Sequence, residues 1–194
     1  GALQEALKKH VEPSQVLHFA TQHNHITLLD ICFGLGYNTI VAISEILHLN
    51  SDCHITVYAF ENDKDILDQI QTITFPEMYK DAGNFAVQLA QSGEVKTSNI
   101  HLKLFKGDFR TTLSFIPDNI ANAVFFDPFS PKKQPELWTE DVFNLVAKKM
   151  KPGAVLTTYS CAKAVRQAMQ AAGLKTYDGP RVGRKSPGTV AVNE

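Results

Sequence analysis

Two glycines one residue apart, Gly34 and Gly36, have the clearest chemical meaning in the chain. They follow a short apolar run at residues 27–33 and precede apolar residues at helical spacing, which is typical of a buried strand leading into a helix. Because glycine has no Cβ and accepts positive φ, such a turn lets the backbone approach a ligand closely and directs free helix N–H groups toward it. The alternative is a tight turn that binds nothing.

The turn departs from both pyrophosphate-binding motifs. Thr39 replaces the third glycine of the dinucleotide fingerprint, and no Gly-Lys-Ser/Thr tripeptide follows the glycines. S-adenosyl-L-methionine (AdoMet) fits better, since its amino acid part and ribose need close backbone and a carboxylate rather than an anion site. The expected cofactor contacts in this stretch are Asp30, Phe33, Gly34, Gly36 and Asn38.

Acidic residues end two further predicted strands. Glu61 follows an apolar strand at 55–60 and can accept hydrogen bonds from both ribose hydroxyls. Asp108 follows a strand at 100–105 and can bind an adenine amino group, with Phe109 stacking on the ring. Each carboxylate also has a local alternative, a favourable charge at a helix N-terminus or a cap for a short helix. Their order on successive strands favours a cofactor site.

Asp127 follows the apolar strand 123–126 and opens the segment Asp-Pro-Phe-Ser-Pro at 127–131. The two prolines hold the backbone extended beyond the strand. A carboxylate, a free carbonyl and an aromatic ring then stand together, and this combination suits an amine that develops positive charge. We predict that Asp127 is the catalytic residue and also contacts the cofactor; the alternative is a proline-rich turn before a helix.

Strand and helix patterns alternate along the whole chain. This alternation predicts a doubly wound α/β fold with a mostly parallel, seven-stranded sheet, in one domain over residues 1–194 with an insertion at 72–98. Further strands are expected at 154–159, 175–177 and 188–192. Helices are expected at 3–17 with an interruption near Pro13, at 38–49, around 66–70, at 138–150 from a cap at Thr139, and at 162–172.

The composition is that of an ordinary globular domain, with 44% hydrophobic and 20% charged residues. No stretch is apolar over the length of a membrane span. The net charge of −1 excludes a general electrostatic attraction to nucleic acid, so such a partner would need a local basic patch. Cys32, Cys53 and Cys161 form no Cys-x-x-Cys pair, and His23 and His25 lack acidic partners. We therefore expect no metal site, no disulfide and a cytoplasmic location.

The glycine turn, Glu61, Asp108 and the 127–131 segment resemble class I AdoMet-dependent methyltransferases, which have a Rossmann-like fold. More narrowly, residues 30–39 (DICFGLGYNT) and 126–139 (FDPFSPKKQPELWT) resemble the methyltransferase module of the MnmC family, as do 158–162, 165–166 and 183–185. The resemblance implies methylation of the primary amine of 5-aminomethyl-2-thiouridine at the tRNA wobble position. It also implies that the flavin oxidoreductase domain of bifunctional members, and the family's sequence before the first helix, are absent here.

The same resemblance indicates contacts with the anticodon arm of a tRNA. Phe129 and Trp138 would pack against a flipped uridine, unless they are ordinary core residues. Lys132, Lys133, Arg181, Arg184 and Lys185 would supply the basic patch, with Arg166 and Lys163 as weaker candidates. The predicted substrate contacts are Pro128, Phe129, Lys132, Lys133, Trp138, Tyr159, Arg184 and Lys185.

Three alternative functions remain open at this point. The chain could methylate another amine, on a small molecule or a protein. It could bind AdoMet without catalysis. An NAD-type oxidoreductase would also use Glu61 at a ribose, although Thr39 argues against it.

Overall fold

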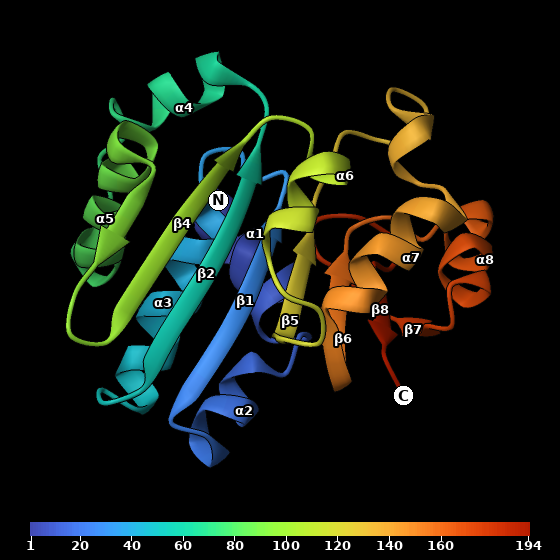
Figure 1. Cartoon of the computed structure of the whole chain (residues 1–194), viewed down its shortest axis with the longest axis horizontal. Coiled ribbons are helices and arrows are strands. Elements are labelled where there is room, and N and C mark those ends of the chain that lie inside the picture. The colour runs from blue at the N-terminus through green and yellow to red at the C-terminus, as the bar shows by residue number, and fades with distance from the viewer.

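The computed structural model describes residues 1–194 as an eight-stranded sheet with helices on both faces (Figure 1). The strand order is β3-β4-β2-β1-β5-β6-β8-β7. The five central strands are parallel, whereas β3, β8 and β7 pair antiparallel with their neighbours. The strands are β1 (His25–Ile31), β2 (His54–Glu61), β3 (Glu94–Lys96), β4 (Ile100–Lys106), β5 (Ala121–Phe126), β6 (Met150–Thr158), β7 (Lys175–Asp178) and β8 (Thr189–Val192). The predicted doubly wound, mostly parallel α/β fold is confirmed.

The predicted number of seven strands is wrong, because β3 adds an eighth. This edge strand has only three residues, and the exposed Glu94 and Lys96 flank the single buried residue Val95. So short a strand leaves no measurable alternation in the sequence. Together with α5 (Lys80–Ser92) and the 3₁₀ turn Glu77–Tyr79, β3 forms most of the 72–98 segment.

The helix predicted at 3–17 consists of three pieces, α1 (Ala2–Ala6), a π-helical turn at Leu7–Val11 and α2 (Val16–Gln22). The Thr139 side chain caps α7 (Glu140–Lys149) by accepting from the Val142 N–H, as predicted, so this helix begins at Glu140 rather than at residue 138. The remaining helices are α3 (Tyr37–Leu49), α4 (Lys64–Ile70), α6 (Phe109–Thr112), α7 (Glu140–Lys149) and α8 (Lys163–Ala171), with 3₁₀ turns at Leu113–Phe115 and Pro135–Leu137. None of the helices combines the length and apolar character needed to cross a membrane.

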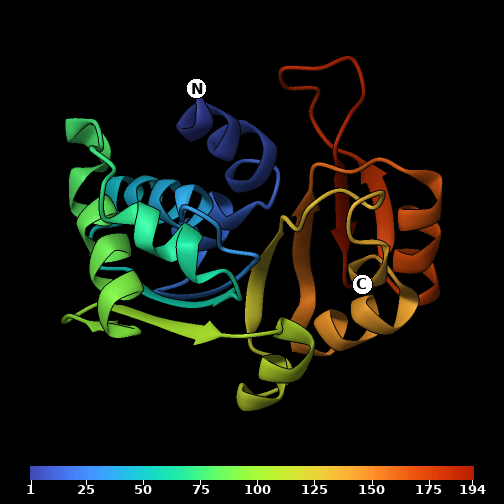
Figure 2. The same ribbon diagram turned by 90° about the horizontal axis from the view of Figure 1, so that it is seen from above.

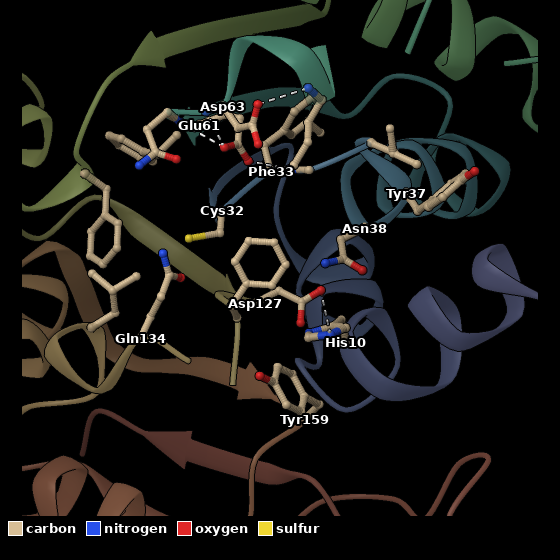
Figure 3. Close-up of a pocket in the computed structure, with 18 of the residues that line it drawn as sticks. His10, Cys32, Phe33, Tyr37, Asn38, Glu61, Asp63, Asp127, Gln134 and Tyr159 are labelled. Carbon is tan, nitrogen blue, oxygen red and sulfur yellow. Dashed lines mark hydrogen bonds and ion pairs between the residues drawn. The ribbon is translucent and has the colours of Figure 1, made fainter. Parts of the chain in front are cut away.

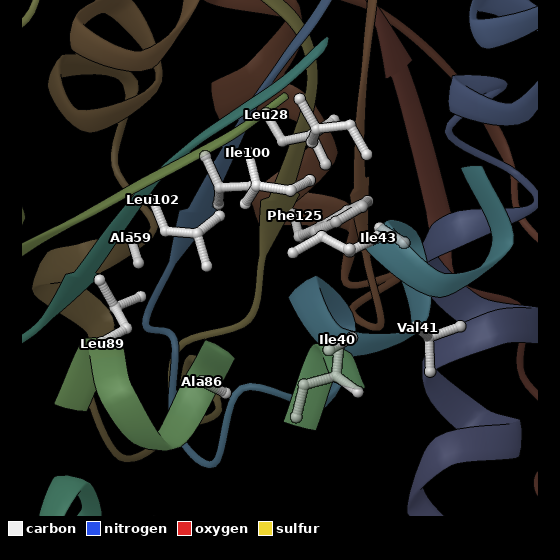
Figure 4. Packing of buried hydrophobic residues seen from close by; sticks show 14 of the residues in the cluster. Leu28, Ile40, Val41, Ile43, Ala59, Ala86, Leu89, Ile100, Leu102 and Phe125 are labelled. Atoms are coloured by element: carbon white, nitrogen blue, oxygen red, sulfur yellow. The ribbon is translucent and has the colours of Figure 1, made fainter. Parts of the chain in front are cut away.

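Two hydrophobic cores lie on opposite faces of the sheet. Successive residues of β1 alternate between them, so Leu28 packs against α3 and α5 while Leu29 packs on the side of α7. Figure 4 shows the first core, in which Phe125 and Ile43 lie between the sheet and the helices. Burial of β1 on both faces is the pattern of a central parallel strand, and it fixes the strand whose end carries the glycine turn.

A buried carboxyl group links β1 to α3. The Asp30 side chain is completely buried, and its Oδ2 accepts a hydrogen bond of 2.7 Å from the Thr39 hydroxyl. Its Oδ1 has no hydrogen-bond partner. Burial raises the pKa of Asp30 to about 8, so the group is mostly protonated at neutral pH.

This raised pKa makes stability depend on pH. An unfolded aspartate titrates near pH 4, so from there to about pH 8 the folded chain holds a proton that the unfolded chain has lost. The contribution of Asp30 to stability is therefore full below about pH 4 and is lost as pH rises through 8. Asp30→Asn cannot ionise and still accepts from Thr39. In urea unfolding, we expect the variant's free energy of unfolding to fall less than that of the wild type between about pH 5 and 8.5, by more than about 1 kcal/mol. Parallel pH curves would contradict this.

Candidate active site

A cavity of about 580 Å³ opens at the carboxyl ends of the parallel strands. Its volume lies in the range of small-molecule and cofactor sites, roughly 300–1,000 Å³. The turns after β1, β2, β4 and β5 meet there, and the N-terminal helix closes one side. Nine of the predicted site residues line it: Phe33, Gly34, Asn38, Glu61, Asp108, Phe109, Asp127, Phe129 and Tyr159.

Both glycines of the turn adopt positive φ, +57° at Gly34 and +78° at Gly36. A Cβ on Gly36 would lie 2.6 Å from Cζ of the Phe33 ring, so this position needs glycine for space as well as for φ. At Gly34 the nearest atom to such a Cβ would be 3.8 Å away, and only φ requires glycine. Asp30 and Gly36, both predicted to contact the cofactor, do not line the cavity and shape the turn instead.

The carboxylate of Glu61 holds the turns after β1 and β2 together. Its Oε2 accepts from the Gly34 N–H at 2.8 Å, and its Oε1 accepts from the N–H groups of Asn62 and Asp63 at 2.8 and 2.9 Å. The local alternative, a helix cap, is filled by Asp63, which caps α4. A carboxylate can accept about four hydrogen bonds, so Glu61 keeps one acceptor position for a ligand.

Asp108 does cap α6, and it also borders the cavity. The Arg110 guanidinium, 2.5 Å away, holds the pKa of this carboxyl below its usual range. The neighbouring Phe109 is 4% exposed, and its ring packs edge-on against Phe126 in the second core. Only a small part of the Phe109 ring is therefore free for a ligand.

Asp127 continues the sheet through its N–H, which donates to the Ile31 carbonyl at 3.1 Å. Its side chain is 37% exposed and points into the cavity, with Oδ2 3.8 Å from Nε2 of the buried His10 (Figure 3). Figure 3 places Glu61 and Phe33, the residue before Gly34, on the other side of the same cavity. The arrangement can hold a ligand by Glu61 and present its far end to the Asp127 carboxylate.

Two side chains hold the backbone after Asp127 in place. The Tyr159 hydroxyl donates to the Pro128 carbonyl and the Trp138 indole N–H donates to the Phe129 carbonyl, both at 2.9 Å. Burial, followed by the Asp127 charge, raises the pKa of Tyr159 to about 12, so this hydroxyl stays protonated. Trp138 is 5% exposed and does not line the cavity, so the predicted base contact is replaced by a core position that supports Phe129. Pro128 does not line it either.

The predicted basic residues lie outside the cavity. Lys133 Nζ is 5.4 Å from the centre of the exposed Phe129 ring, and the Arg184 guanidinium is 5.8 Å from that of Tyr159. Arg184 belongs to the loop at 179–188, which projects on the same side as the N-terminal helix (Figure 2). Lys132 and Lys185 do not line the cavity. Arg166 binds Thr189, Gly188 and Asp178, so it supports β7 and β8.

Sequence reasoning missed the contribution of the N-terminal helix to the cavity. Ala2, Glu5, Ala6, Lys9 and His10 line it, yet no motif marks them. Cys32 was also missed; it has a positive φ of +64°, and burial raises the pKa of its thiol.

Acidic residues outnumber basic ones in the lining, which favours a cationic ligand. The lining acids are Glu5, Glu61, Asp63, Asp108, Asp127 and Glu136, and the bases are Lys9 and Arg110. No group of three or more His, Cys, Asp or Glu side chains could hold a metal ion.

Comparisons with known proteins agree with this chemistry. A family model described as S-adenosyl-L-methionine-dependent methyltransferase matches residues 74–194. An uncharacterised protein of Methanocaldococcus jannaschii is 32% identical over 98% of this chain and 52% of its own length. The tRNA 5-methylaminomethyl-2-thiouridine biosynthesis bifunctional protein MnmC of Ralstonia nicotianae is 40% identical over 93 residues, which are 48% of this chain and 14% of that protein.

A solved structure matches the whole fold. The crystal structure of MNMC2 from Aquifex aeolicus superimposes with a TM-score of 0.88 and 32% identity, covering 100% of this chain and 62% of that one. The chain thus spans about half to three fifths of the two relatives that match it throughout. These matches support AdoMet as the cofactor, in place of the nicotinamide cofactor considered as an alternative.

The two glycines should differ in their tolerance of alanine. Gly34→Ala adds only the cost of positive φ, about 1 kcal/mol, whereas Gly36→Ala adds the same cost plus the overlap with Phe33. We expect Gly36→Ala to lower the free energy of unfolding by about 1–3 kcal/mol more than Gly34→Ala, measured by urea denaturation. Gly93→Ala, with positive φ and open space around its Cβ, serves as control and should resemble Gly34→Ala. Equal losses at positions 34 and 36 would contradict the role of Phe33.

Proposed function

Since the chain belongs to the S-adenosyl-L-methionine-dependent methyltransferase family and forms a module like the methyltransferase part of MnmC, we propose that it methylates a tRNA base. The substrate group is the primary amine of 5-aminomethyl-2-thiouridine at the wobble position. The observation that carries this proposal is the position of the Asp127 carboxylate in the same cavity as Glu61 and the glycine turn. AdoMet, the cofactor of this family, supplies an electrophilic methyl group when bound.

The residues of the cavity fit this cofactor. Glu61 has one acceptor position left, which suits a ribose hydroxyl. Asp108 borders the same space, but Arg110 already contacts both of its oxygens, so an adenine amino group would have to share or displace one of these contacts. Gly34 and Asn38 border the same space, where the absence of a Cβ at Gly34 allows close approach. The excess of acidic groups favours a positively charged sulfonium.

Asp127 would act on the amine in three ways. Its carboxylate accepts N–H bonds and so aligns the nitrogen lone pair with the methyl group, which supplies rate through positioning. It stabilises the positive charge that develops on the nitrogen during transfer. It then accepts the proton that the methylated amine releases, directly or through water.

The rim of the cavity suits a nucleotide. A wobble base lies in a single-stranded loop and is easily turned outward, and the exposed ring of Phe129 offers a surface for stacking. Lys133 beside Phe129 and Arg184 beside Tyr159 are placed to meet phosphates of the anticodon arm. Because the net charge is only −1, binding would rest on this local patch with Arg181, Lys132 and Lys185. Such a substrate implies a cytoplasmic location.

Replacing Asp127 should separate binding from catalysis. We expect Asp127→Ala to leave AdoMet affinity within about threefold in isothermal titration calorimetry, because Glu61 and the glycine turn are untouched. Methyl transfer to tRNA bearing 5-aminomethyl-2-thiouridine should fall by about 100-fold or more, because the substrate nitrogen loses the carboxylate that aligns it and stabilises its positive charge. Asp52→Ala, on the exposed turn after α3, is the control and should match the wild type.

The choice of tRNA tests the substrate. The same tRNA without the aminomethyl group should accept no methyl group. Transfer to small primary amines or to protein, with none to the modified tRNA, would overturn the proposal in favour of another amine. An AdoMet-bound wild type that methylates none of these substrates would indicate a binding module without catalysis.

A further inference from the structure

His10 lies in the cavity against Asp127, although 117 positions separate the two in the chain. Its side chain is 4% exposed, and its Nε2 is 3.8 Å from Asp127 Oδ2. No other imidazole lines the cavity. Figure 3 shows this pair on the side of the cavity away from Glu61.

The local backbone explains why His10, on the N-terminal helix (residues 2–11), reaches the cavity. Pro13 has no N–H to donate, and its ring crowds the carbonyl four residues earlier, which disfavours regular α-helical pairing there. Just before it the helix forms a π turn, in which the Glu12 N–H donates to the Leu7 carbonyl at 2.9 Å. Single π turns inside helices are frequent at functional sites. Here the turn carries His10 and Val11 inward, and both are buried.

The ring of His10 is held on its other edge as well. Nδ1 lies 3.2 Å from the hydroxyl of Thr157, which is completely buried in β6, and the ring packs edge-on against Phe125. Burial lowers the pKa of His10 despite the nearby Asp127 charge, and Lys9 lowers it further, so the ring is neutral and carries one N–H. A lone pair facing the carboxylate would be repelled. The Thr157 hydroxyl has one hydrogen and two acceptors in reach, His10 Nδ1 at 3.2 Å and the His10 backbone carbonyl at 3.5 Å. Because of the repulsion at Nε2, we assign that hydrogen to Nδ1, which places the ring N–H at Nε2, directed at Asp127.

We propose that His10 is a positioning residue for the methyl transfer, in which its Nε2–H fixes Oδ2 of Asp127 and leaves Oδ1 free for the substrate amine. Contacts of this kind are often long before ligands bind and shorten in the reactive complex. The role in methyl transfer rests on the proposed function, whereas the orientation of the carboxylate does not. Thr157 belongs to the same arrangement, since it orients the ring.

Four variants test this role in the full chain. His10→Leu removes the donor at similar volume, and His10→Gln returns an amide N–H near the place of Nε2. Thr157→Val removes the hydroxyl behind the ring. Thr158→Val is the matched control, because its buried hydroxyl has no hydrogen-bond partner.

We expect His10→Leu to lower kcat on the modified tRNA by about 10- to 100-fold, with KM for tRNA and AdoMet affinity within about threefold. His10→Gln should recover most of kcat, Thr157→Val should lose part of it, and Thr158→Val should keep it. In the Asp127→Asn background, His10→Leu should cost less than about twofold more, since the two residues act as a unit. Should His10→Leu fail to fold, Thr157→Val and His10→Gln carry the same comparison.

Crystal structures of the wild type and of His10→Leu, both with S-adenosylhomocysteine, give a readout that needs no tRNA. We expect Nε2 within hydrogen-bond distance of Oδ2 in the wild type and a rotated or disordered Asp127 carboxylate in His10→Leu. An unchanged carboxylate, or a His10→Gln variant as slow as His10→Leu while equally stable, would overturn the role of His10. A wild type with no activity on the modified tRNA would overturn the proposed function alone.

Discussion

The site depends on one carboxylate that accepts three backbone N–H groups. Glu61, at the end of β2, accepts from Gly34 after β1 and from its own neighbours Asn62 and Asp63, so separating the two strand ends would break the hydrogen bond to the part-buried Gly34 N–H. The register of the two strands makes this possible, because Ile31 pairs with Phe60 and the glycine turn therefore starts level with Glu61. Charged acceptors make strong hydrogen bonds, and such a turn stays ordered before any ligand arrives.

The same turn stores backbone strain next to the cavity. Cys32, a residue with a Cβ, has a φ of +64°, a conformation that costs about 1–2 kcal/mol. The sheet holds it there, since the next N–H, of Phe33, donates to the Phe60 carbonyl at 3.0 Å. Strand pairing thus resumes past Cys32, and the Phe33 ring covers the position where Gly36 must lack a Cβ. The strained backbone at Cys32, the Phe33 ring and the glycine at position 36 together set the shape of this wall of the cavity.

The sequence predicts those parts of the site that follow from strand order, and it fails where contacts are distant. Parallel strands bring their carboxyl ends to one edge, so Glu61, Asp108 and Asp127 could be placed together from their positions alone. The aromatic residue types do not say whether a ring faces core or cavity, and Trp138 lies in the core. The edge strand β3 is too short to produce a pattern. The position of His10 depends on a π turn and on contact with Thr157 of β6, and the local hydrophobic pattern of the sequence predicts neither.

Charge is divided between the inside of the cavity and its surroundings. The lining is acidic, which suits a sulfonium and an amine that becomes positive, but the same charges would repel a polyanionic tRNA. Lys9 and Arg110 are the only basic residues of the lining, whereas Arg184, on the loop at 179–188, and Lys133, after β5, lie outside it beside aromatic rings. Since salt limits the reach of exposed charges to about 8 Å at physiological ionic strength, each region acts on what touches it. The proposed function therefore needs no overall positive charge: with a net charge of −1, the acidic lining would attract the cation and the basic residues at the rim would meet the phosphates.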